Sequence, residues 1–307
     1  MQLAIPTTDF PVARVIVVVL DGLRADAIPL FQLRQLERLA REGRATFHAT
    51  TVTPSVTAAA MASLFTGADP AHHGLCSDRF HIPRGIASID PLPRLLQRAA
   101  LPTFTFMARL PFGYGRLANR MAQTVGVTRA SFDGDGALAI LTSARDTLAR
   151  ERRGLFVFHW PDADRAGHAS GWTSPAYRTA ARCLDETLGA LDAFTGASSD
   201  PETLLIALAD HGGGGHLEKN HESAHPQDRR IPLLLAGGRV IPGDLGAGCS
   251  LLDVPATVCW ALGVPVPPSF AGRPFNDALS GTGEPGRRYA PVADPCSPHH
   301  PEVALCT

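Results

Sequence analysis

Carboxylate and imidazole side chains follow three apolar runs of the chain, at the points where those runs end. Asp21 follows the run RVIVVVL, Asp164 and His168 follow GLFVFHW, and Asp210 with His211 follows TLLIALA. Without a thiolate, this mixture of ligands suits zinc, with manganese and iron as alternatives. The set is larger than one mononuclear site needs, which indicates two divalent metal ions.

Three further histidines, His216, His221 and His225, stand shortly after the third run. Each polar residue also has an ordinary structural explanation when it is taken alone. Asp21 before a glycine can form a turn, and Asp164 can cap a helix. These explanations weaken because several separate segments deliver the same ligand types to the ends of apolar runs.

The three runs have the composition of buried strands in a mostly parallel sheet. Further strands are expected over 46–52, 103–107 and 231–235, and helices over 28–41, 58–65, 94–99, 136–152, 175–194 and 251–262. Strands that alternate with helices predict an α/β fold, a three-layer α/β/α sandwich with a mostly parallel central sheet. Ligands bind at the carboxyl edge of such sheets, so the polar residues above should meet there. We expect residues 111–119, rich in glycine and aromatic residues, to form a surface loop.

Composition limits the class of protein. The 307 residues include 28 Lys and Arg against 29 Asp and Glu, and this net charge of -1 argues against a nucleic-acid-binding surface. We expect one catalytic domain over residues 1–280 and a poorly ordered tail over 281–307, which is rich in Pro, Gly and His. The N-terminus lacks the pattern of a signal peptide and no apolar run is long enough to span a bilayer, so we expect a cytoplasmic protein without membrane contact. The oligomeric state stays open.

Four segments in order along the chain resemble the alkaline phosphatase superfamily. They are VIVVVLDGLRAD, TPSVTAAAMASLFTG, the DxxGH segment that begins at Asp164, and ADHGGGGH. The branch that they resemble most is the type I phosphodiesterase/nucleotide pyrophosphatase family. The resemblance runs from about Val15 to about Leu279, and it implies an alkaline phosphatase-like fold.

The resemblance also implies a role for each matching residue. Asp21, Asp210 and His211 would hold one metal ion, and Asp164, His168 and His221 would hold the other. Thr57 would be the nucleophile, ten residues before the glycine of LFTG. His221 is preferred because it stands five residues before a proline, and His216 is the alternative.

The chain departs from the family at one position near the nucleophile. In the diesterase branch an asparagine commonly binds a phosphoryl oxygen, and here the corresponding residue is Asp78, followed by Arg79. An ionised aspartate would repel a phosphate dianion more than a monoanion, so we expect phosphodiesters, or phosphonate monoesters, to be better substrates than phosphomonoesters. Lys219 and Arg165 are candidate partners of the phosphate that would favour monoesters instead.

The same motifs allow other functional interpretations. A sulfatase would carry Cys or Ser in a CxPSR-like segment, where this chain has Thr57 followed by alanines. A phosphomutase of the superfamily usually carries a large inserted domain, for which the span from Gly67 to Asp164 has little room. An inactive binding paralogue would have lost ligands, and here every position is filled. A phosphomonoesterase or a phosphonate hydrolase stays the main alternative to a phosphodiesterase.

Overall fold

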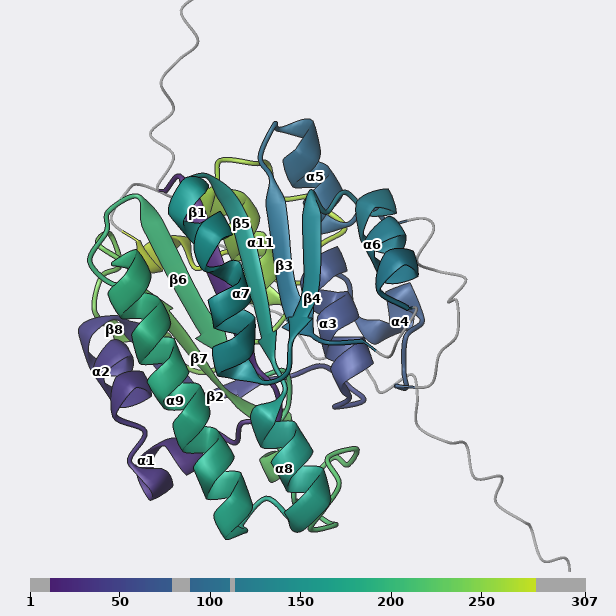
Figure 1. The fold of residues 1–307 in the computed structure, drawn as a ribbon, viewed down its shortest axis with the longest axis vertical. Coiled ribbons are helices and arrows are strands. Elements are labelled where there is room, and N and C mark those ends of the chain that lie inside the picture. The colour runs from purple at the N-terminus through teal and green to yellow at the C-terminus, as the bar shows by residue number, and fades with distance from the viewer. Residues whose placement is uncertain (1–11, 79–88, 111–113, 280–307) are drawn as a thin grey trace, which may run out of the picture.

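Eight strands form one sheet at the centre of the computed structural model, which describes residues 12–78, 89–110 and 114–279 (Figure 1). The strands are β1 (Arg14–Leu20), β2 (Arg44–Thr50), β3 (Thr103–Ala108), β4 (Arg129–Gly134), β5 (Gly154–Trp160), β6 (Thr203–Leu208), β7 (Arg230–Ala236) and β8 (Gly243–Asp244). Their order across the sheet is β4-β3-β5-β1-β6-β7-β2-β8. Only β7 runs antiparallel to its neighbours.

Helices cover both faces of this sheet. They are α1 (Ala27–Phe31), α2 (Arg34–Glu42), α3 (Thr57–Thr66), α4 (Pro70–His73), α5 (Leu92–Arg98), α6 (Tyr114–Thr124), α7 (Ala137–Arg150), α8 (Asp162–Ser170), α9 (Pro175–Thr195), α10 (Pro226–Arg229) and α11 (Asp253–Ala261), with a short 3₁₀ turn at Asn276–Ala278. Figure 1 shows α7 and α9 in front of the sheet and α3 and α11 behind it. The three-layer α/β/α fold expected from the sequence is therefore confirmed.

The two central strands are buried along their whole length because a helix layer lies on each side. All seven residues of β1 are buried, and so are all six of β6. The sequences of both strands are almost continuously apolar, as expected of parallel strands covered on two faces. The arrowheads of β5 and β6 point to the lower end of the molecule in Figure 1, where α8 lies. The polar residues that follow these strands are therefore delivered to one edge.

Two local expectations were wrong. The helix expected over 28–41 is two helices, α1 and α2, because Gln32 adopts a left-handed conformation with φ of 53° that ends the first one. The loop expected over 111–119 is helical from Tyr114 onward, in α6. The run from Arg116 to Gln123 is rich in good helix formers, which outweighs the glycine at 115. Residues 111–113 and the tail over 281–307 lie outside the described residues.

The described helices include none with both the length and the apolar composition that a membrane crossing requires.

Candidate metal centre and active site

Three adjacent strands, β5, β1 and β6, deliver the candidate ligands to one edge of the sheet. The backbone N–H of Asp21, just past β1, donates to Trp160 O of β5, and Asp164 N–H donates to Asp21 O at 2.9 Å. Gly22 makes this close approach geometrically feasible. Its φ is +71°, and a Cβ there would lie 2.7 Å from the Cα of Asp164. The Asp-Gly pair thus lets the segment after β1 pack directly against Asp164 in α8.

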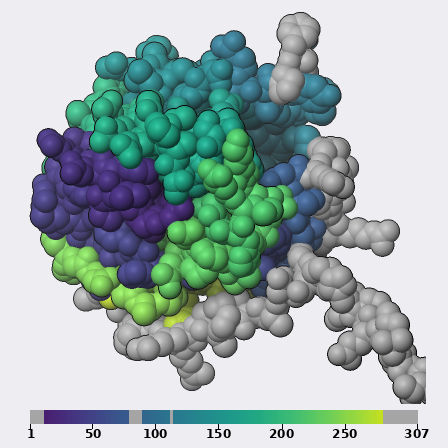
Figure 2. All heavy atoms as spheres, turned by 90° about the horizontal axis from the view of Figure 1, so that it is seen from below, coloured from purple at the N-terminus to yellow at the C-terminus, as the bar shows by residue number. Residues whose placement is uncertain are grey.

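The structure brings the six expected ligands together. Asp21, Asp210 and His211 form one group whose ligand atoms all lie within 4.8 Å of one another, and Asp164, His211 and His221 form a second. His168 adjoins the second group, with its Nε2 3.4 Å from Asp164 Oδ1. His211 therefore lies between the two groups. Figure 2 shows the purple segment after β1 beside the green segment after β6 at this end of the molecule.

Each of the three histidines is turned the same way. His168 Nδ1 lies 3.0 Å from Lys219 O, His211 Nδ1 lies 2.8 Å from Gly212 O, and His221 Nδ1 lies 2.6 Å from the backbone carbonyl of residue 55. A carbonyl can only accept, so each Nδ1 carries the proton and each Nε2 keeps its lone pair. Hydrogen bonds of this kind fix the orientation of metal-binding imidazoles.

The Nε2 lone pairs then face other acceptors. Nε2 of His168 and Nε2 of His221 are 3.1 Å apart, and with both protons on Nδ1 neither nitrogen can donate to the other. Nε2 of His211 lies 3.5 Å from Asp21 Oδ1 and 3.6 Å from Asp210 Oδ2. Acceptors that converge without donors repel one another, and a bound cation would remove this repulsion.

The carboxylates have the same property. Asp21 Oδ1, Asp164 Oδ1 and Asp210 Oδ2 are buried and have no hydrogen-bond partner among the described residues. Burial, together with the charges of Asp210 and Asp164, raises the pKa of Asp21 well above its usual value. Burial also raises the pKa of Asp164. Burial and the neighbouring His211 lower the pKa of His221 to about 4, which leaves it neutral and able to bind a metal at pH 7. The donor set fits divalent cations.

Thr57 is the first residue of α3, on the opposite layer from α9. Its hydroxyl oxygen lies 3.1 Å from His211 Nε2, and since that nitrogen is an acceptor, the hydroxyl is the donor. The side chain is half-buried, so one side of it is open. This contact puts the expected nucleophile beside the residue that the two ligand groups share.

Asp78 reaches the same place from the segment after α4. Its Oδ1 accepts the backbone N–H of Ala58 at 2.8 Å, at the N-terminus of the ten-residue helix α3. Helix N-termini attract anions, and here a carboxylate of the chain itself takes one of the free N–H groups. Arg79 lies outside the described residues.

The remaining candidates point elsewhere. The ring of His216 packs edge-on against His225, and neither belongs to a metal-ligand group within the described ranges. Lys219 Nζ donates to Ala169 O at 2.9 Å, near the end of α8. Arg165 forms an exposed ion pair with Asp135 at 2.6 Å. The described residues thus give these side chains other partners than the ligand groups.

His159, the penultimate residue of β5, also lies at the site and was not predicted from the sequence. Its Nε2 is buried, has no hydrogen-bond partner among the described residues, and lies 3.4 Å from Asp21 Oδ2. Burial lowers the pKa of His159, so the ring is neutral. The available signal was a lone polar residue inside the apolar run GLFVFHW, paired in register with Val19 of β1.

Comparisons with known proteins identify the family of the chain. A family model described as type I phosphodiesterase / nucleotide pyrophosphatase matches residues 15–89 and 101–228. Among curated proteins, two 2,3-bisphosphoglycerate-independent phosphoglycerate mutases from Synechococcus strains are 30% and 31% identical over 149 residues. The match covers 45% of this chain but only 27% of each mutase, so the chain spans about a quarter of their length.

Solved structures share the fold at low identity. A murine ectonucleotide pyrophosphatase / phosphodiesterase, an inactive variant in complex with AMP, has a TM-score of 0.68 and 14% identity over 87% of this chain and 100% of that one. A phosphonate monoester hydrolase from Silicibacter pomeroyi has a TM-score of 0.63 and 15% identity over 90% and 78%. A 2-O GAG sulfatase has a TM-score of 0.65 and 14% identity over 88% and 74%.

Proposed function

Because this chain belongs to the type I phosphodiesterase/nucleotide pyrophosphatase family, we propose that it is a metal-dependent phosphoric ester hydrolase with Thr57 as its nucleophile. The observation that carries the proposal is the convergence of buried, unpartnered acceptors on two adjacent ligand groups beside the Thr57 hydroxyl. Asp21, Asp210 and His211 would hold one divalent ion. Asp164, His168 and His221 would hold the other. We propose zinc, with manganese or iron as alternatives.

The residues divide the chemistry between them. Bound divalent ions would supply the positive charge that favours the alkoxide of Thr57 and neutralises the negative charge on the phosphoryl oxygens. Thr57 Oγ releases its proton to solvent and forms the new bond to phosphorus, while the ester oxygen on the opposite side leaves and takes up a proton from solvent. Water then breaks the Thr57–phosphate bond and returns the hydroxyl. The free N–H groups at the start of α3 face the oxygens of the phosphoryl group.

The charge around the site supports a monoanionic substrate. Bound divalent ions would offset the charges of Asp21, Asp164 and Asp210, whereas Asp78 adds a further carboxylate at the N-terminus of α3 that belongs to neither ligand group. A phosphomonoester carries about two negative charges near neutral pH. Since Lys219 and Arg165 are bonded elsewhere, no cation from either reaches the phosphate to compensate. We propose a phosphodiester, or a phosphonate monoester of the same charge, as the substrate class; a phosphomonoester is the alternative.

Thr57→Ala tests the assignment. The ligands remain, so elemental analysis should still find two equivalents of metal, while turnover of bis-(p-nitrophenyl) phosphate should fall by about 10³-fold or more. Thr53→Ala is the matched control, because it removes a nearby hydroxyl that lacks the contact with His211. Near-normal turnover in Thr57→Ala would refute the nucleophile. Metal-free protein with unchanged turnover would refute the metal-dependent mechanism.

A further inference from the structure

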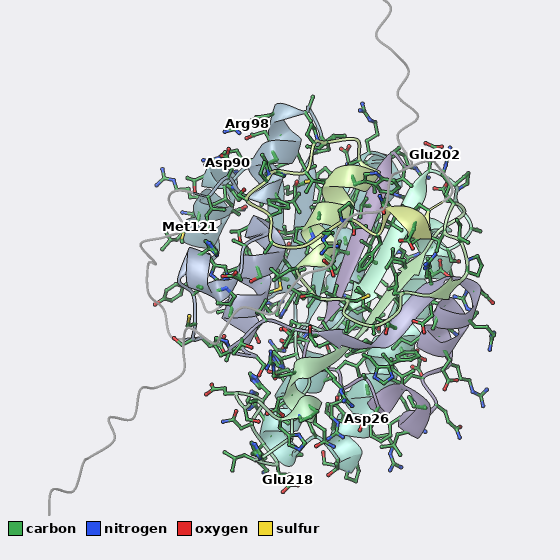
Figure 3. The ribbon with its side chains drawn as sticks, turned by 180° about the vertical axis from the view of Figure 1, so that it is seen from behind. Asp26, Asp90, Arg98, Met121, Glu202 and Glu218 are labelled. Carbon is green, nitrogen blue, oxygen red and sulfur yellow. The ribbon has the colours of Figure 1, made fainter. Side chains whose placement is uncertain are left out.

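A cavity lies in the helix layer opposite to α3, apart from the candidate metal centre. It has a volume of about 610 Å³, is open on one side, and is lined by the segment from Arg24 to Pro29, by α2, by β2 and by α10. This volume lies within the range of small-molecule sites. Figure 3 shows Asp26, one of its lining residues, at the lower end of the molecule, the end where Glu218 lies. We refer to it as the α2–β2 pocket.

The apolar wall of this pocket depends on an irregularity in β2. Thr46 pairs with Leu233 and Ala49 with Ile231, so two residues of β2 oppose the single residue Pro232 of β7. A proline cannot donate to the ladder, and a bulge is a common way for a sheet to accommodate such a position. Successive residues of a regular strand point to opposite faces, yet both residues of the bulge, Phe47 and His48, line the pocket. Ile28 and Ala40 complete the apolar surface.

The polar rim carries unpaired positive charge. Arg41 and Arg230 are exposed at the pocket, and within the described ranges neither guanidinium has a hydrogen-bond or ion-pair partner. Arg24 is held by Asp26, with Nε to Oδ1 at 2.8 Å. Glu37 is the other acidic residue in the lining. Three arginines against two carboxylates leave one net positive charge, which matches a monoanion better than a dianion.

The pocket is separate from the candidate metal centre. No expected metal ligand lines it, and neither does Thr57. The buried side chain of Arg24 stands between the two sites, with Nη1 3.5 Å from Gly213 O, two residues after His211. A ligand in this pocket would therefore contact residues that the hydrolytic reaction does not use.

We propose that the α2–β2 pocket binds a small monoanionic carboxylate with an apolar aryl or acyl body. The body lies against Phe47, Ile28 and Ala40, and the carboxylate is held by Arg41 and Arg230. Arginine suits this role because its planar fork matches the two oxygens of a carboxylate.

Calorimetric titration of the full-length protein with 2-naphthoate and with 2-naphthamide tests the proposal. The two probes share a body and differ in charge, so naphthoate should bind at least about tenfold more tightly. The double variant Arg41→Gln/Arg230→Gln should weaken naphthoate by about tenfold or more and leave naphthamide unchanged. Ala40→Phe fills the cavity and should abolish binding of both probes.

Arg34→Gln is the matched control, because Arg34 is an exposed arginine of the same helix that does not line the pocket. It should leave the affinity for naphthoate within about twofold of the original value. The proposal is overturned if the original protein binds no naphthoate, if the double variant binds it as tightly as the original, or if Arg34→Gln weakens it equally. Undiminished binding in Ala40→Phe would also overturn it, since the probe would then lie elsewhere, such as at the metal centre.

Discussion

Asp228 and Asp253 are charged side chains in the interior of the scaffold, and donors surround both. Asp228 accepts the backbone N–H groups of Gly215 at 2.8 Å and Ser223 at 3.2 Å, together with the Ser223 hydroxyl. Asp253 accepts two backbone N–H groups, from residue 250 and from Arg273, both at 2.8 Å. These carboxylates hold loops in place.

The carboxylates at the carboxyl edge of the sheet are buried to a similar degree, but donors do not reach both oxygens of each: Asp210 Oδ1 accepts the N–H groups of Gly22 and His211, whereas its Oδ2 has no partner among the described residues. Asp21, Asp164 and Asp210 each have an oxygen without a hydrogen-bond partner among the described residues. The imidazoles near them also direct acceptor nitrogens inward. A buried acceptor without a donor costs free energy, so a fold that gathers several of them needs a cation from outside. Burial alone therefore does not mark a functional carboxylate; missing donors do.

Asp21→Asn, which changes a carboxylate with an unpartnered oxygen, should have the largest effect. Loss of a ligand should remove one equivalent of metal and lower turnover by about 10³-fold or more. With zinc present, loss of the ligand should lower the free energy of unfolding. In chelated protein the effect on stability should have the opposite sign, because the change removes a carboxyl group whose pKa is raised by burial and by Asp210. The free energy of unfolding should then rise by about 1 kcal/mol or more. Elemental analysis and turnover measure the loss of the ligand, and thermal unfolding with zinc and with chelator measures the change in stability.

Asp228→Asn is the matched control on the scaffold side. It should keep both metal equivalents and lower the free energy of unfolding by about 1–3 kcal/mol, with and without zinc alike. A loss of metal in Asp228→Asn, or an Asp21→Asn protein that is less stable than the original after chelation, would remove the distinction between the two kinds of buried carboxylate.

His159→Gln tests a buried residue that contacts a proposed metal ligand but does not itself belong to a ligand group. Nε2 of His159 lies 3.4 Å from Asp21 Oδ2, so the ring limits where that carboxylate can lie. Changes at such positions typically weaken metal affinity by about 10–100-fold, and we expect a loss in this range. His216→Gln, on the loop after β6, should change zinc affinity by less than about twofold. Equal losses in the two variants would show that His159 has no special relation to Asp21.

These positions show what the sequence allowed us to predict about the site. The ligands end apolar runs, and parallel strands bring such positions to one edge, so Asp21, Asp164 and Asp210 were predictable as a cluster. His159 was not, because a polar residue within a buried run carries no sign of which neighbour it faces. That information lies in the register between β5 and β1.

Some elements of the fold were also predictable from the sequence and others were not. The buried strands β1, β5 and β6 were predicted to within a residue or two because their apolar runs have no competing explanation. Strand β4 was missed, since its sequence RASFDG has little apolar character and pairs only at the sheet edge. The break between α1 and α2 depends on the backbone of Gln32, which the apolar spacing of the segment hides.

His73 is a buried histidine outside the ligand groups, and it can be compared with His221. It is fully buried, and unlike His221 both of its nitrogens have partners within the protein, Ser63 Oγ and the N–H of Leu75. Burial lowers its pKa from 6.5 to about 4. Between these values the unfolded chain binds a proton that the folded chain does not, so stability falls as the pH falls through this window.

Urea unfolding of chelated protein at pH 7 and pH 5 measures this effect. The original protein should lose about 1–2 kcal/mol more stability over this interval than His73→Gln, which has no proton to bind. The metal ligands also titrate in chelated protein, but their contribution is the same in both proteins and cancels in the difference. The same pH dependence in both proteins would mean that His73 titrates normally in the folded state.

Lys219→Ala should have the smallest effect, and it tests whether a cation with a partner can still serve the phosphate. Lys219 Nζ donates to Ala169 O near the C-terminal end of α8, where the helix dipole favours a positive charge. We therefore expect the ratio of kcat/KM for bis-(p-nitrophenyl) phosphate to that for p-nitrophenyl phosphate to change by less than about twofold. Asp78→Asn is the contrasting variant, because it removes a negative charge bonded to the first turn of α3 and should favour the monoester by about tenfold. If the original protein prefers the monoester and Lys219→Ala abolishes that preference, the lysine leaves Ala169 to bind the phosphate. The protein would then be a phosphomonoesterase. A hydrogen bond to another residue would then not be sufficient evidence that a side chain has only a structural role.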